Sequence, residues 1–380
     1  MILTLKLLLS SLAGVGICYY LLCIYAVLRF FLDTPDRASE DLPPVTILIP
    51  LCGADFDALS NYISFCRQDY PQFQLIFGVQ KPNDSSIPVV WQLMADFPRR
   101  DIKLVVCPEI IGENRKVSNL HNMLPHARHE QIVIVDSDIR VGRDFLRSTV
   151  PHLNDPSVGL VTCFYRAAHP ENWAASLEAI EITAEFQPSV VVARMLEGMT
   201  FALGAAMVTT QEKLRIIGGF PAIADYLADD YMLGNLIHKA GYQVRLVPYV
   251  VQTVLGPLQF ARMLRHQIRW ARVKRVCRPC GYLGLILTYG TPFALFAAIV
   301  SRGAPANLVL LAAALGTRLL MGWLVGYRCL GDATVRQYLW LLPLRDMLSF
   351  LIWCVSLVGK RIEWRGRVFE IADDGRMIPI

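Results

Sequence analysis

Two aspartates that follow a strongly apolar segment are the first residues in this chain whose types and spacing point to chemistry. The segment Ile132 to Val135 is rich in β-branched residues and predicts a buried β-strand. Asp136 and Asp138 come directly after it, at the carboxyl end where open α/β sheets bind ligands, and residues two apart in a strand point to the same side. One carboxylate could hold a divalent cation while the other contacts a nucleotide. A second D-x-D sequence, at residues 55–57, is the weaker candidate because residues 50–54 separate it from the preceding strand.

Three more groups of polar residues follow the same logic along the chain. They are Asp84 just beyond a predicted strand, Asp229 and Asp230 at the start of a segment with helical spacing, and Arg269 and Trp270 at the end of the sequence RHQIRW. Taken singly, each has a structural explanation: a turn residue, a helix N-cap, and an arginine–tryptophan pair at a membrane surface. The seven histidines show no spacing typical of metal ligands.

The chain between residues 43 and 255 predicts the elements that position these groups. Apolar strand-like segments alternate with segments of helical periodicity, which predicts an α/β domain with a mostly parallel sheet covered on both faces. The expected strands are 45–49, 73–80, 102–106 and 131–135, and the expected helices are 57–69, 87–97 and 116–127. The second half predicts strands over 157–164 and 244–247 and helices over 171–196 and 225–238.

The sequence lacks the motifs that are typical of several other classes of protein. No G-x-G-x-x-G follows the first expected strand and no Walker A sequence is present, which disfavours dinucleotide binding and ATP or GTP hydrolysis. The net charge of +5 is too small to indicate a nucleic-acid partner. Ten cysteines are scattered, and the C-x-x-C at residues 277–280 has no second pair, so we expect reduced cysteines rather than a zinc or redox site.

Four apolar blocks flank this domain. Residues 5–32 are long enough for a spanning helix of about 20 residues, and no cleavage site follows them, so we expect a retained anchor. The blocks at 281–300, 305–327 and 338–358 form C-terminal membrane segments. Arg318 and the pair Arg345-Asp346 lie inside these blocks, where charge is costly in lipid. Either the last block is interfacial or re-entrant, or the charges face another helix, and the number of crossings stays open.

A basic amphipathic segment, residues 256–280, joins the domain to these blocks. Apolar residues from Phe260 to Ala271 recur at helical spacing opposite a run of arginines, which suits a helix lying in the membrane interface. The alternative is a surface helix of the soluble domain. Basic residues beside an apolar block are typical of the cytoplasmic face, where we expect the domain. Four full crossings would leave the basic tail, residues 359–380, on the other side, against this tendency.

Together, in this order and between these blocks, the groups resemble the inverting family-2-type glycosyltransferases. The resemblance is strongest to the ceramide glucosyltransferase-like, family-21-type branch, which includes bacterial hopanoid-biosynthesis enzymes and carries three aspartate sites followed by Q/R-x-x-R-W. It runs from about Val45 to Trp270, with further matches at residues 112–120 and 364–367. It implies a GT-A fold with a mixed, mostly parallel sheet and with N- and C-terminal transmembrane helices. The chain departs from the pattern at His266, at Asp229 and at Gln187, where animal enzymes usually have histidine.

The resemblance implies a role for each site residue. Asp138 would bind Mg²⁺ or Mn²⁺, and Asp84 and Asp136 would hold the uridine and ribose side of a UDP-sugar, with Asn119 beside them. Lys116 and Arg269 would place positive charge near the phosphates. Asp230 would be the general base, Trp270 would form a stacking wall, and His266 stands in the catalytic motif.

The implied reaction moves a hexose from a UDP-sugar to a lipid hydroxyl. UDP-glucose and ceramide are the first choice, and transfer of N-acetylglucosamine to bacteriohopanetetrol, a polyol hopanoid, is the alternative. A processive polysaccharide synthase would need more spanning helices, and a non-catalytic lipid-binding protein would lack at least one of the catalytic residues. We expect an integral membrane protein of the bacterial inner membrane with its catalytic domain on the cytoplasmic face.

Overall fold

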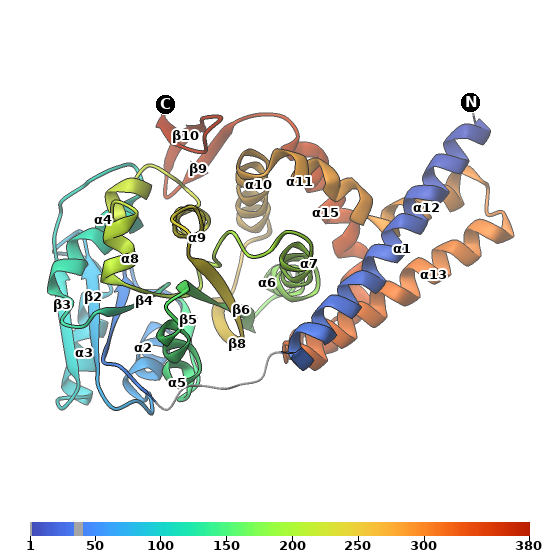
Figure 1. The fold of residues 1–380 in the computed structure, drawn as a ribbon. Helices are drawn as coiled ribbons and strands as arrows, with labels where there is room; N and C mark the ends of the chain where they lie inside the picture. Colours follow the sequence, from blue (N-terminus) through green and yellow to red (C-terminus); the bar gives the residue numbers. More distant parts are fainter. Residues whose placement is uncertain (1, 34–40) are drawn as a thin grey trace.

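The computed structural model describes residues 2–33 and 41–380 and contains a mixed eight-stranded sheet (Figure 1). The strands lie in the order β3-β2-β1-β4-β7-β6-β8-β5. Their bounds are β1 Val45–Pro50, β2 Phe73–Val79, β3 Asp101–Val106, β4 Gln131–Val135, β5 Ile139–Arg140, β6 Val158–Pro170, β7 Ala206–Thr210 and β8 Gln243–Gly256. The predicted α/β fold with a mixed, mostly parallel sheet is confirmed.

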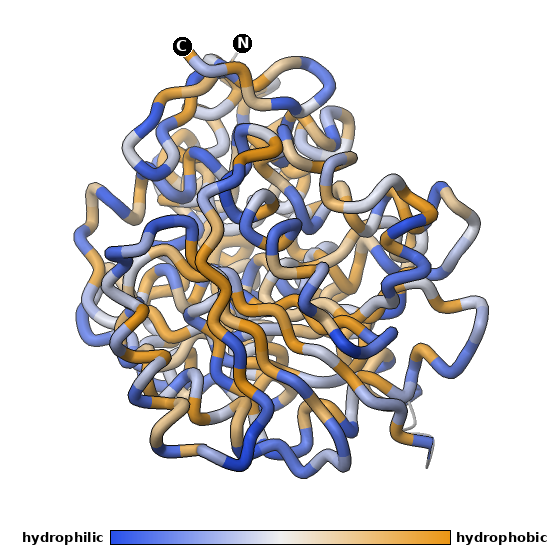
Figure 2. Tube along the Cα trace, turned by 90° about the vertical axis from the view of Figure 1, so that its left-hand side faces the viewer, coloured by the Kyte–Doolittle hydropathy of each residue, from blue (hydrophilic) through white to orange (hydrophobic). Residues whose placement is uncertain are grey.

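The first half of the sheet follows the predicted alternation of strand and helix. β1 pairs in parallel with β2 and β4, and β2 pairs in parallel with β3. The connecting helices are α2 Ala58–Cys66, α3 Ile87–Asp96 and α4 Arg115–Met123. Every residue of β1 and β2 is buried, which requires cover on both faces, and a separate apolar cluster lies on each face. Figure 2 shows hydrophobic chain through the centre and hydrophilic segments mostly at the periphery.

The second half of the sheet differs from the prediction in two places. β7 pairs antiparallel with both β4 and β6 and was not predicted. β8 continues well past residue 247, where the sequence interpretation ended the strand. The pairing of β6 with β8 shifts register between Val247 and Val250, so Pro248 and Tyr249 form a bulge in the strand. A proline inside a strand is confined to edges and bulges, which explains the interrupted pattern.

The expected long helix over residues 171–196 is divided by a π-helical turn. It consists of α6 Trp173–Glu181, the π-helix η3 Ile182–Phe186 and α7 Gln187–Glu197, with Pro188 in the first turn of α7. The remaining helices of this half are α5 Phe145–Thr149, α8 Gln211–Ile216 and α9 Asp229–Lys239. Proline lacks a backbone N–H, and π-turns inside helices are frequent at functional sites.

Apolar helices lie at both ends of the chain. Within residues 2–33 and 41–380, three helices are long and apolar enough to cross a membrane: Ile2–Asp33, Pro305–Cys329 and Leu339–Ser356. A fourth span is possible if Pro279–Thr288 and Gly290–Val300, which meet at a 51° bend, act as one. The elements involved are α1 Ile2–Asp33, α11 Pro279–Gly284, η5 Leu285–Thr288, α12 Gly290–Val300, α13 Pro305–Met321, η6 Gly322–Cys329, α14 Ala333–Gln337, η7 Leu339–Leu341 and α15 Leu342–Ser356. In Figure 1, α1, α12 and α13 project together from the sheet domain.

The charges inside the apolar blocks face other helices. Arg318 of α13 pairs with Asp346 of α15 at 2.8 Å between Nη2 and Oδ1, and both side chains are buried. Arg345 Nη1 donates to Gln267 Oε1 of the basic helix over residues 260–277 at 2.7 Å. Of the two alternatives left open by the sequence, the structure therefore supports the one in which the charges face another helix. The charged pair in the last block is neutralised by other protein groups, as buried charges require.

The anchor helix α1 also packs on the sheet domain. The side chains of its second half, including Cys23 and Phe30, belong to the same buried cluster as the sheet residues Leu48 and Ile134. The Phe30 ring meets the Phe164 ring edge to face at 5.3 Å between centroids. The first apolar block is thus continuous with the core of the sheet domain rather than a separate tether.

The basic helix α10, Phe260–Cys277, is covered by other elements along much of its length. Met263, Gln267 and Ala271 are buried, and the helix contacts α6, α15 and β9. The C-terminal residues form a second, three-stranded sheet of β9 Arg361–Trp364, β10 Arg367–Ile371 and β11 Met377–Pro379. Val273 and Val276 of α10 pack against the apolar side of this sheet, which lies beside α10 in Figure 1. The basic tail is therefore folded against the helix that carries the R-W motif.

Candidate active site

The first aspartate of the site is held at the carboxyl edge of the parallel strands. Asp84 lies in the turn after β2, where the backbone N–H of Gly53, beyond β1, donates to both of its carboxylate oxygens at 3.0 Å. Ser86 donates from its hydroxyl at 2.6 Å and from its backbone at 2.9 Å. Burial opposes the charge, but these hydrogen bonds outweigh it, so the pKa of Asp84 is lowered. Asp84 is therefore a fixed carboxylate at the strand ends.

The two aspartates after β4 are held in a second arrangement. Thr253 of β8 donates its hydroxyl to Asp138 Oδ2 at 2.7 Å, and the Val254 N–H donates to the Asp138 carbonyl oxygen. Burial, and then the charge of Asp136, raise the pKa of Asp138 to about 7. Burial also raises the pKa of Asp136, although Lys116 opposes the shift. The charged forms of these two neighbouring carboxylates are both disfavoured, so a nearby cation would stabilise them.

Lys116 connects the D-x-D loop to helix α9. Its Nζ lies 2.7 Å from Asp136 Oδ1 and 3.0 Å from Asp229 Oδ2. Burial acts against the ammonium, but the charges of Asp136 and then Asp229 outweigh it, so the pKa of Lys116 is raised. Asn114 caps α4 by accepting from the Lys116 and Val117 N–H groups, which sets the start of the helix that carries this lysine. The sequence interpretation gave no role to Asp229 or Asn114, although an asparagine two residues before the lysine is a helix N-cap signal.

Asp230 lies in the first turn of α9 with one oxygen held and the other available. The Tyr231 N–H donates to Asp230 Oδ1 at 2.7 Å. A Cβ atom at Gly204 would lie 2.9 Å from Asp230 Oδ2, so the absence of a side chain at Gly204 leaves space beside that oxygen. Burial and then the charge of Asp229 raise the pKa of Asp230 to about 6. A carboxylate with this pKa can accept a proton near neutral pH.

Helix α10 brings the R-W motif to the site. His266 Nδ1 lies 3.1 Å from Glu178 Oε1 of α6, and the His266 ring contacts the Trp270 ring at 4.1 Å between centroids. Arg269 makes no hydrogen bond or ion pair with any residue in the described ranges 2–33 and 41–380. Burial, and then the charge of Arg365, lower its pKa to about 10. An unpaired, partly buried guanidinium is suited to bind an anion.

Arg365 comes from the C-terminal sheet and was not among the predicted site residues. It forms the turn between β9 and β10 with Gly366, and both have positive φ, 50° and 75°, as a two-residue hairpin turn requires. The side chain is exposed, and its charge acts on both Arg269 and Asp136. Arg367, the next basic residue, fixes the hairpin through Glu113 at 2.8 Å. The only signal in the sequence was the short W-R-G-R match, which gave no position.

The structure also shows the surroundings of Asn119 and of the weaker D-x-D candidate. Asn119 is 3% exposed and its Nδ2 donates to the carbonyl oxygens of Gly78 at 2.7 Å and Leu51 at 3.3 Å, so it ties the ends of β1 and β2 together. Its assignment to the donor stays a prediction. The weaker D-x-D candidate lies next to the stronger one, because Ser137 donates to Asp55 Oδ2 at 2.5 Å and Arg140 pairs with Asp57 at 2.6 Å.

The residues present fit a divalent cation shared with a substrate. Among the residues described, no group of three or more His, Cys, Asp or Glu side chains could hold a metal ion. Mg²⁺ and related ions are commonly bound by one or two carboxylates together with substrate phosphates. Asp138 offers a hard oxygen donor, and the charges of Asp136 and Asp55 that raise its pKa would be offset by a cation.

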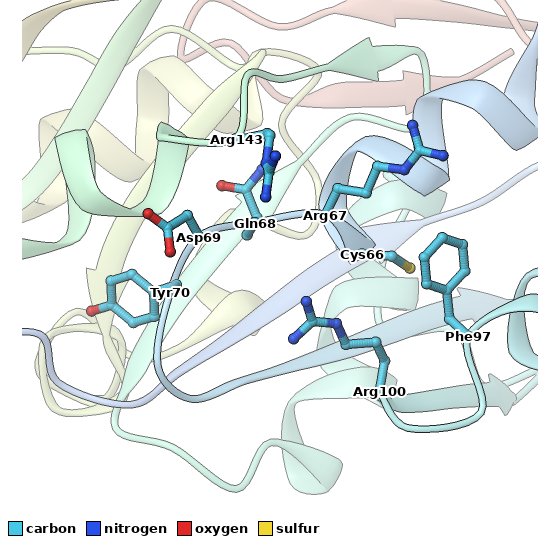
Figure 3. A pocket seen from close by; sticks show the side chains of 8 residues that line it. All are labelled: Cys66, Arg67, Gln68, Asp69, Tyr70, Phe97, Arg100 and Arg143. Carbon is cyan, nitrogen blue, oxygen red and sulfur yellow. The ribbon is translucent and has the colours of Figure 1, made fainter.

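A separate cavity of about 610 Å³ lies away from these residues (Figure 3). Most of its lining comes from the end of α2 with the segment before β2 and from the turn before β3, which lie at the amino ends of strands parallel to β1, and Arg143 joins it from the loop after β5. The buried Gln68 amide in its wall is hydrogen-bonded on both sides, to Ser64, Gly142 and Leu146. None of the predicted site residues lines this cavity, so it lies at the opposite edge of the sheet.

A mixed sheet with acidic groups at its carboxyl edge and arginines facing them is the arrangement of a GT-A-type glycosyltransferase. The sequence pattern of glycosyl transferase family 21 matches residues 8–377, so the chain belongs to that family. The protein is therefore a glycosyltransferase, as the resemblance of its motifs predicted.

Individual relatives agree with this assignment. The chain is similar to ceramide glucosyltransferase 3 of Caenorhabditis elegans, with 22% identity over 382 residues, or 95% of this chain and 80% of the relative. It is also similar to the ceramide glucosyltransferase of Candida albicans, with 31% identity over 135 residues, or 32% of this chain and 25% of the relative. A mannosyltransferase from Pyrobaculum calidifontis, solved in complex with GDP-Man and Mn²⁺, shares the fold with a TM-score of 0.53, 21% identity, and coverage of 91% of this chain and 98% of its own.

Proposed function

We propose that the protein is a membrane-bound inverting glycosyltransferase that moves glucose from UDP-glucose to the hydroxyl group of ceramide. The family assignment and the names of the relatives support the acceptor and the donor. Transfer of N-acetylglucosamine to a polyol hopanoid would use the same site chemistry, and it is an outcome of the experiment below.

One observation carries the proposal: the site contains unsatisfied charge of both signs. Asp138 has no cationic partner within residues 2–33 and 41–380, and the nearby charge of Asp136 disfavours its ionised form, whereas Arg269 has no anionic partner there and is disfavoured by the charge of Arg365. A diphosphate with a divalent cation offsets both, because the cation meets the carboxylates while the phosphate oxygens meet the guanidinium groups. A nucleoside diphosphate sugar is the substrate class that brings this pair of charges.

The reaction assigned to these residues is a single displacement. The acceptor oxygen forms a bond to the anomeric carbon while the bond from that carbon to the diphosphate oxygen breaks, and UDP leaves. Asp230 Oδ2 takes the hydroxyl proton, and Arg269 and Arg365 bind the charge that develops on the leaving diphosphate. A cation bound at Asp138, Mg²⁺ or Mn²⁺, would supply further charge stabilisation. Asp84, whose pKa is lowered, would accept hydrogen bonds from the uridine and ribose side.

We place the sheet domain and the C-terminal sheet on the same, cytoplasmic side of the membrane. The C-terminal sheet packs on α10, so the segments between residues 281 and 358 would cross the membrane an even number of times. The bent pair Pro279–Thr288 and Gly290–Val300 would supply one crossing and Pro305–Cys329 a second. α12 and α13 pack beside α1 and each other, while α15 would lie against α10 near the interface. This arrangement keeps the basic residues of α10 and of the tail on one side, as the positive-inside tendency requires.

The decisive experiment offers two donors and two acceptors to the purified, detergent-solubilised protein. UDP-glucose and UDP-N-acetylglucosamine are each combined with ceramide or bacteriohopanetetrol, with Mn²⁺, with Mg²⁺ or with EDTA, and lipid products are identified by mass spectrometry. We expect glucosylceramide from UDP-glucose only when a divalent cation is present. The variant Asp138→Asn should form much less of this product at the same metal concentration, and the control Asp96→Asn, at an exposed position at the end of α3, should form as much as the wild type.

The outcomes separate the alternatives. Formation of N-acetylglucosaminyl hopanoid with no glucosylceramide would replace ceramide by a hopanoid as the acceptor. If thermal denaturation shows that the protein is folded and no combination of donor and acceptor gives a product, the proposal is overturned.

A further inference from the structure

A second cavity lies between the sheet domain and the apolar helices. It has a volume of about 70 Å³, which is room for several water molecules at 10–15 Å³ each. Its wall combines polar groups from α6 and η3, among them Glu181 and Glu185, with Lys274 of α10 and Ser349 of α15. Leu285 and Met321 line it from the side of the apolar helices. We call this space the glutamate cavity.

Glu181 carries an unsatisfied polar atom in this wall. Its residue is 6% exposed, and its Oε2 has no hydrogen-bond partner among the described residues. Burial raises its pKa, against the opposing charge of Lys274. The neighbouring Glu185 is satisfied, because Ser349 donates to its Oε2 at 2.6 Å. A buried carboxylate oxygen without a partner is rare in folded proteins and indicates a ligand or water that donates to it.

Further unsatisfied groups surround the same region. Glu178, one helical turn before Glu181, has a partner for Oε1 in His266 but none for Oε2 among the described residues. Gln267 Nε2 and Arg345 Nε also lack hydrogen-bond partners in the part of the chain described. The region therefore contains both acceptors and donors that are unmet. Hydroxyl and amide groups offer both functions, whereas a phosphate group offers only acceptors.

The glutamate cavity lies close to the R-W motif, because Glu178, one helical turn before Glu181, contacts His266 at 3.1 Å and the His266 ring contacts the Trp270 ring. Tyr165 of β6 is buried, and the charges of Glu181, Asp230 and Glu178 add to burial in raising its pKa. Its ring contacts Phe186 of the π-turn at 5.9 Å between centroids. Glu181 of the cavity and Asp230, the proposed base, therefore both act on the Tyr165 hydroxyl group.

The charge of the lining selects the kind of head group. Arg318 and Asp346, which both contribute to the wall, neutralise each other in a buried ion pair. The carboxylates of Glu181 and Glu185 face two cations, since Lys274 lies in the wall and Arg345 Nε lies 3.7 Å from Glu185 Oε2. The lining therefore has no excess positive charge to bind an anionic head group, and the unpaired Glu181 Oε2 favours a neutral donor of hydrogen bonds.

We propose that the glutamate cavity binds the polar head of the lipid acceptor, a neutral head group that carries hydroxyl groups with or without an amide, and that Glu181 accepts a hydrogen bond from it. This inference rests on the proposed function, because it names the acceptor side of the same active site. The hydrocarbon part of the lipid lies toward Leu285 and Met321, among the apolar helices. Glu181 is a specificity residue for the acceptor and takes no part in binding the donor.

The test compares Glu181→Gln with a matched control in the full-length protein. Glu171→Gln changes an exposed glutamate just before the same helix and should behave as wild type. In Glu181→Gln we expect the KM for short-chain ceramide to rise about tenfold or more, because a hydrogen bond to a charged group is lost. The KM for UDP-glucose and the slow release of UDP without acceptor should not change. Ser349→Ala, which removes the partner of Glu185, provides a second variant if the first fails to fold.

Direct lipid binding separates this proposal from the proposed function. Native mass spectrometry should show that the wild-type protein retains ceramide or bacteriohopanetetrol but not phosphatidic acid, and that Glu181→Gln loses this retention. Retention that depends on Glu181 without sugar transfer would overturn the proposed function and leave the head-group site standing. Transfer with an unchanged acceptor KM in a folded Glu181→Gln protein would overturn the head-group site. The relative retention of ceramide and hopanoid decides which neutral lipid is the ligand.

Discussion

Replacing Asp230 by asparagine removes the proposed proton acceptor while keeping the size of the side chain. A positioned general base contributes about 10²–10⁴-fold to a rate, so kcat should fall by about that factor. The KM for UDP-glucose should stay the same, because Asp230 is assigned to the acceptor side. Burial and Asp229 already disfavour the charged form of Asp230 in the folded protein, so the neutral asparagine should not lower the thermal stability.

The same carboxyl group predicts the pH dependence. Its pKa is raised to about 6 by burial and by Asp229, with Lys116 opposing the shift and Asp136 adding to it. Only the ionised form accepts a proton, so kcat should be level well above pH 6 and fall about tenfold per pH unit below it. An aspartate with an ordinary pKa would keep its activity down to about pH 4. In Asp230→Asn the remaining rate should not show this fall.

The assay is glucosylceramide formation at saturating donor and acceptor from pH 5 to pH 8.5, with thermal denaturation of each variant at every pH. Asp96→Asn, at an exposed position on α3, serves as the charge-matched control. If Asp230→Asn kept more than about one tenth of the wild-type kcat, or if the wild-type rate stayed level to pH 5, the proton would leave through another group and the assignment of the base would be wrong.

Four further outcomes follow from the contacts described. Asp138→Asn should weaken the response to Mn²⁺ in a metal titration of turnover, and an unchanged half-saturating concentration would exclude Asp138 as a ligand. Arg365→Ala should raise the KM for UDP-glucose about tenfold through loss of a charge-assisted contact, while the exposed Arg99→Ala should not; equal KM values in both would remove Arg365 from the site. Arg318→Met alone should lower the free energy of unfolding by about 3–5 kcal/mol, because it leaves the buried Asp346 without a partner. The double variant Arg318→Met with Asp346→Leu should recover most of this stability. Equal stability of the single and double variants would contradict this prediction. In sealed inverted membrane vesicles, added protease should remove a tag fused to the carboxyl terminus, and removal only from right-side-out vesicles would refute the shared side of tail and sheet domain.

The parallel half of the sheet was predictable because its signals are local. The apolar segments that became β1 to β4 are short, rich in β-branched residues and separated by helical periodicity, and all of them occur where they were expected. β7 was missed because an antiparallel strand between β4 and β6 depends on partners distant in sequence. β8 was shortened because Pro248 interrupts the pattern, and only its pairing with β6 shows that the strand continues beyond the bulge.

The chain by itself determined the family, the order of the acidic groups and the presence of apolar blocks, since these depend on residue type and spacing alone. Tertiary structure decided which groups face one another. Lys116 pairs with Asp229 although the two lie far apart in the sequence, and the C-terminal hairpin brings Arg365 to the site from still further along the chain. Such contacts arise from packing, because an ion pair or an unpaired buried carboxylate such as Glu181 is defined by what surrounds it after folding. The D-x-D aspartates could be identified in the sequence, while the charges that set their protonation exist only in the folded chain.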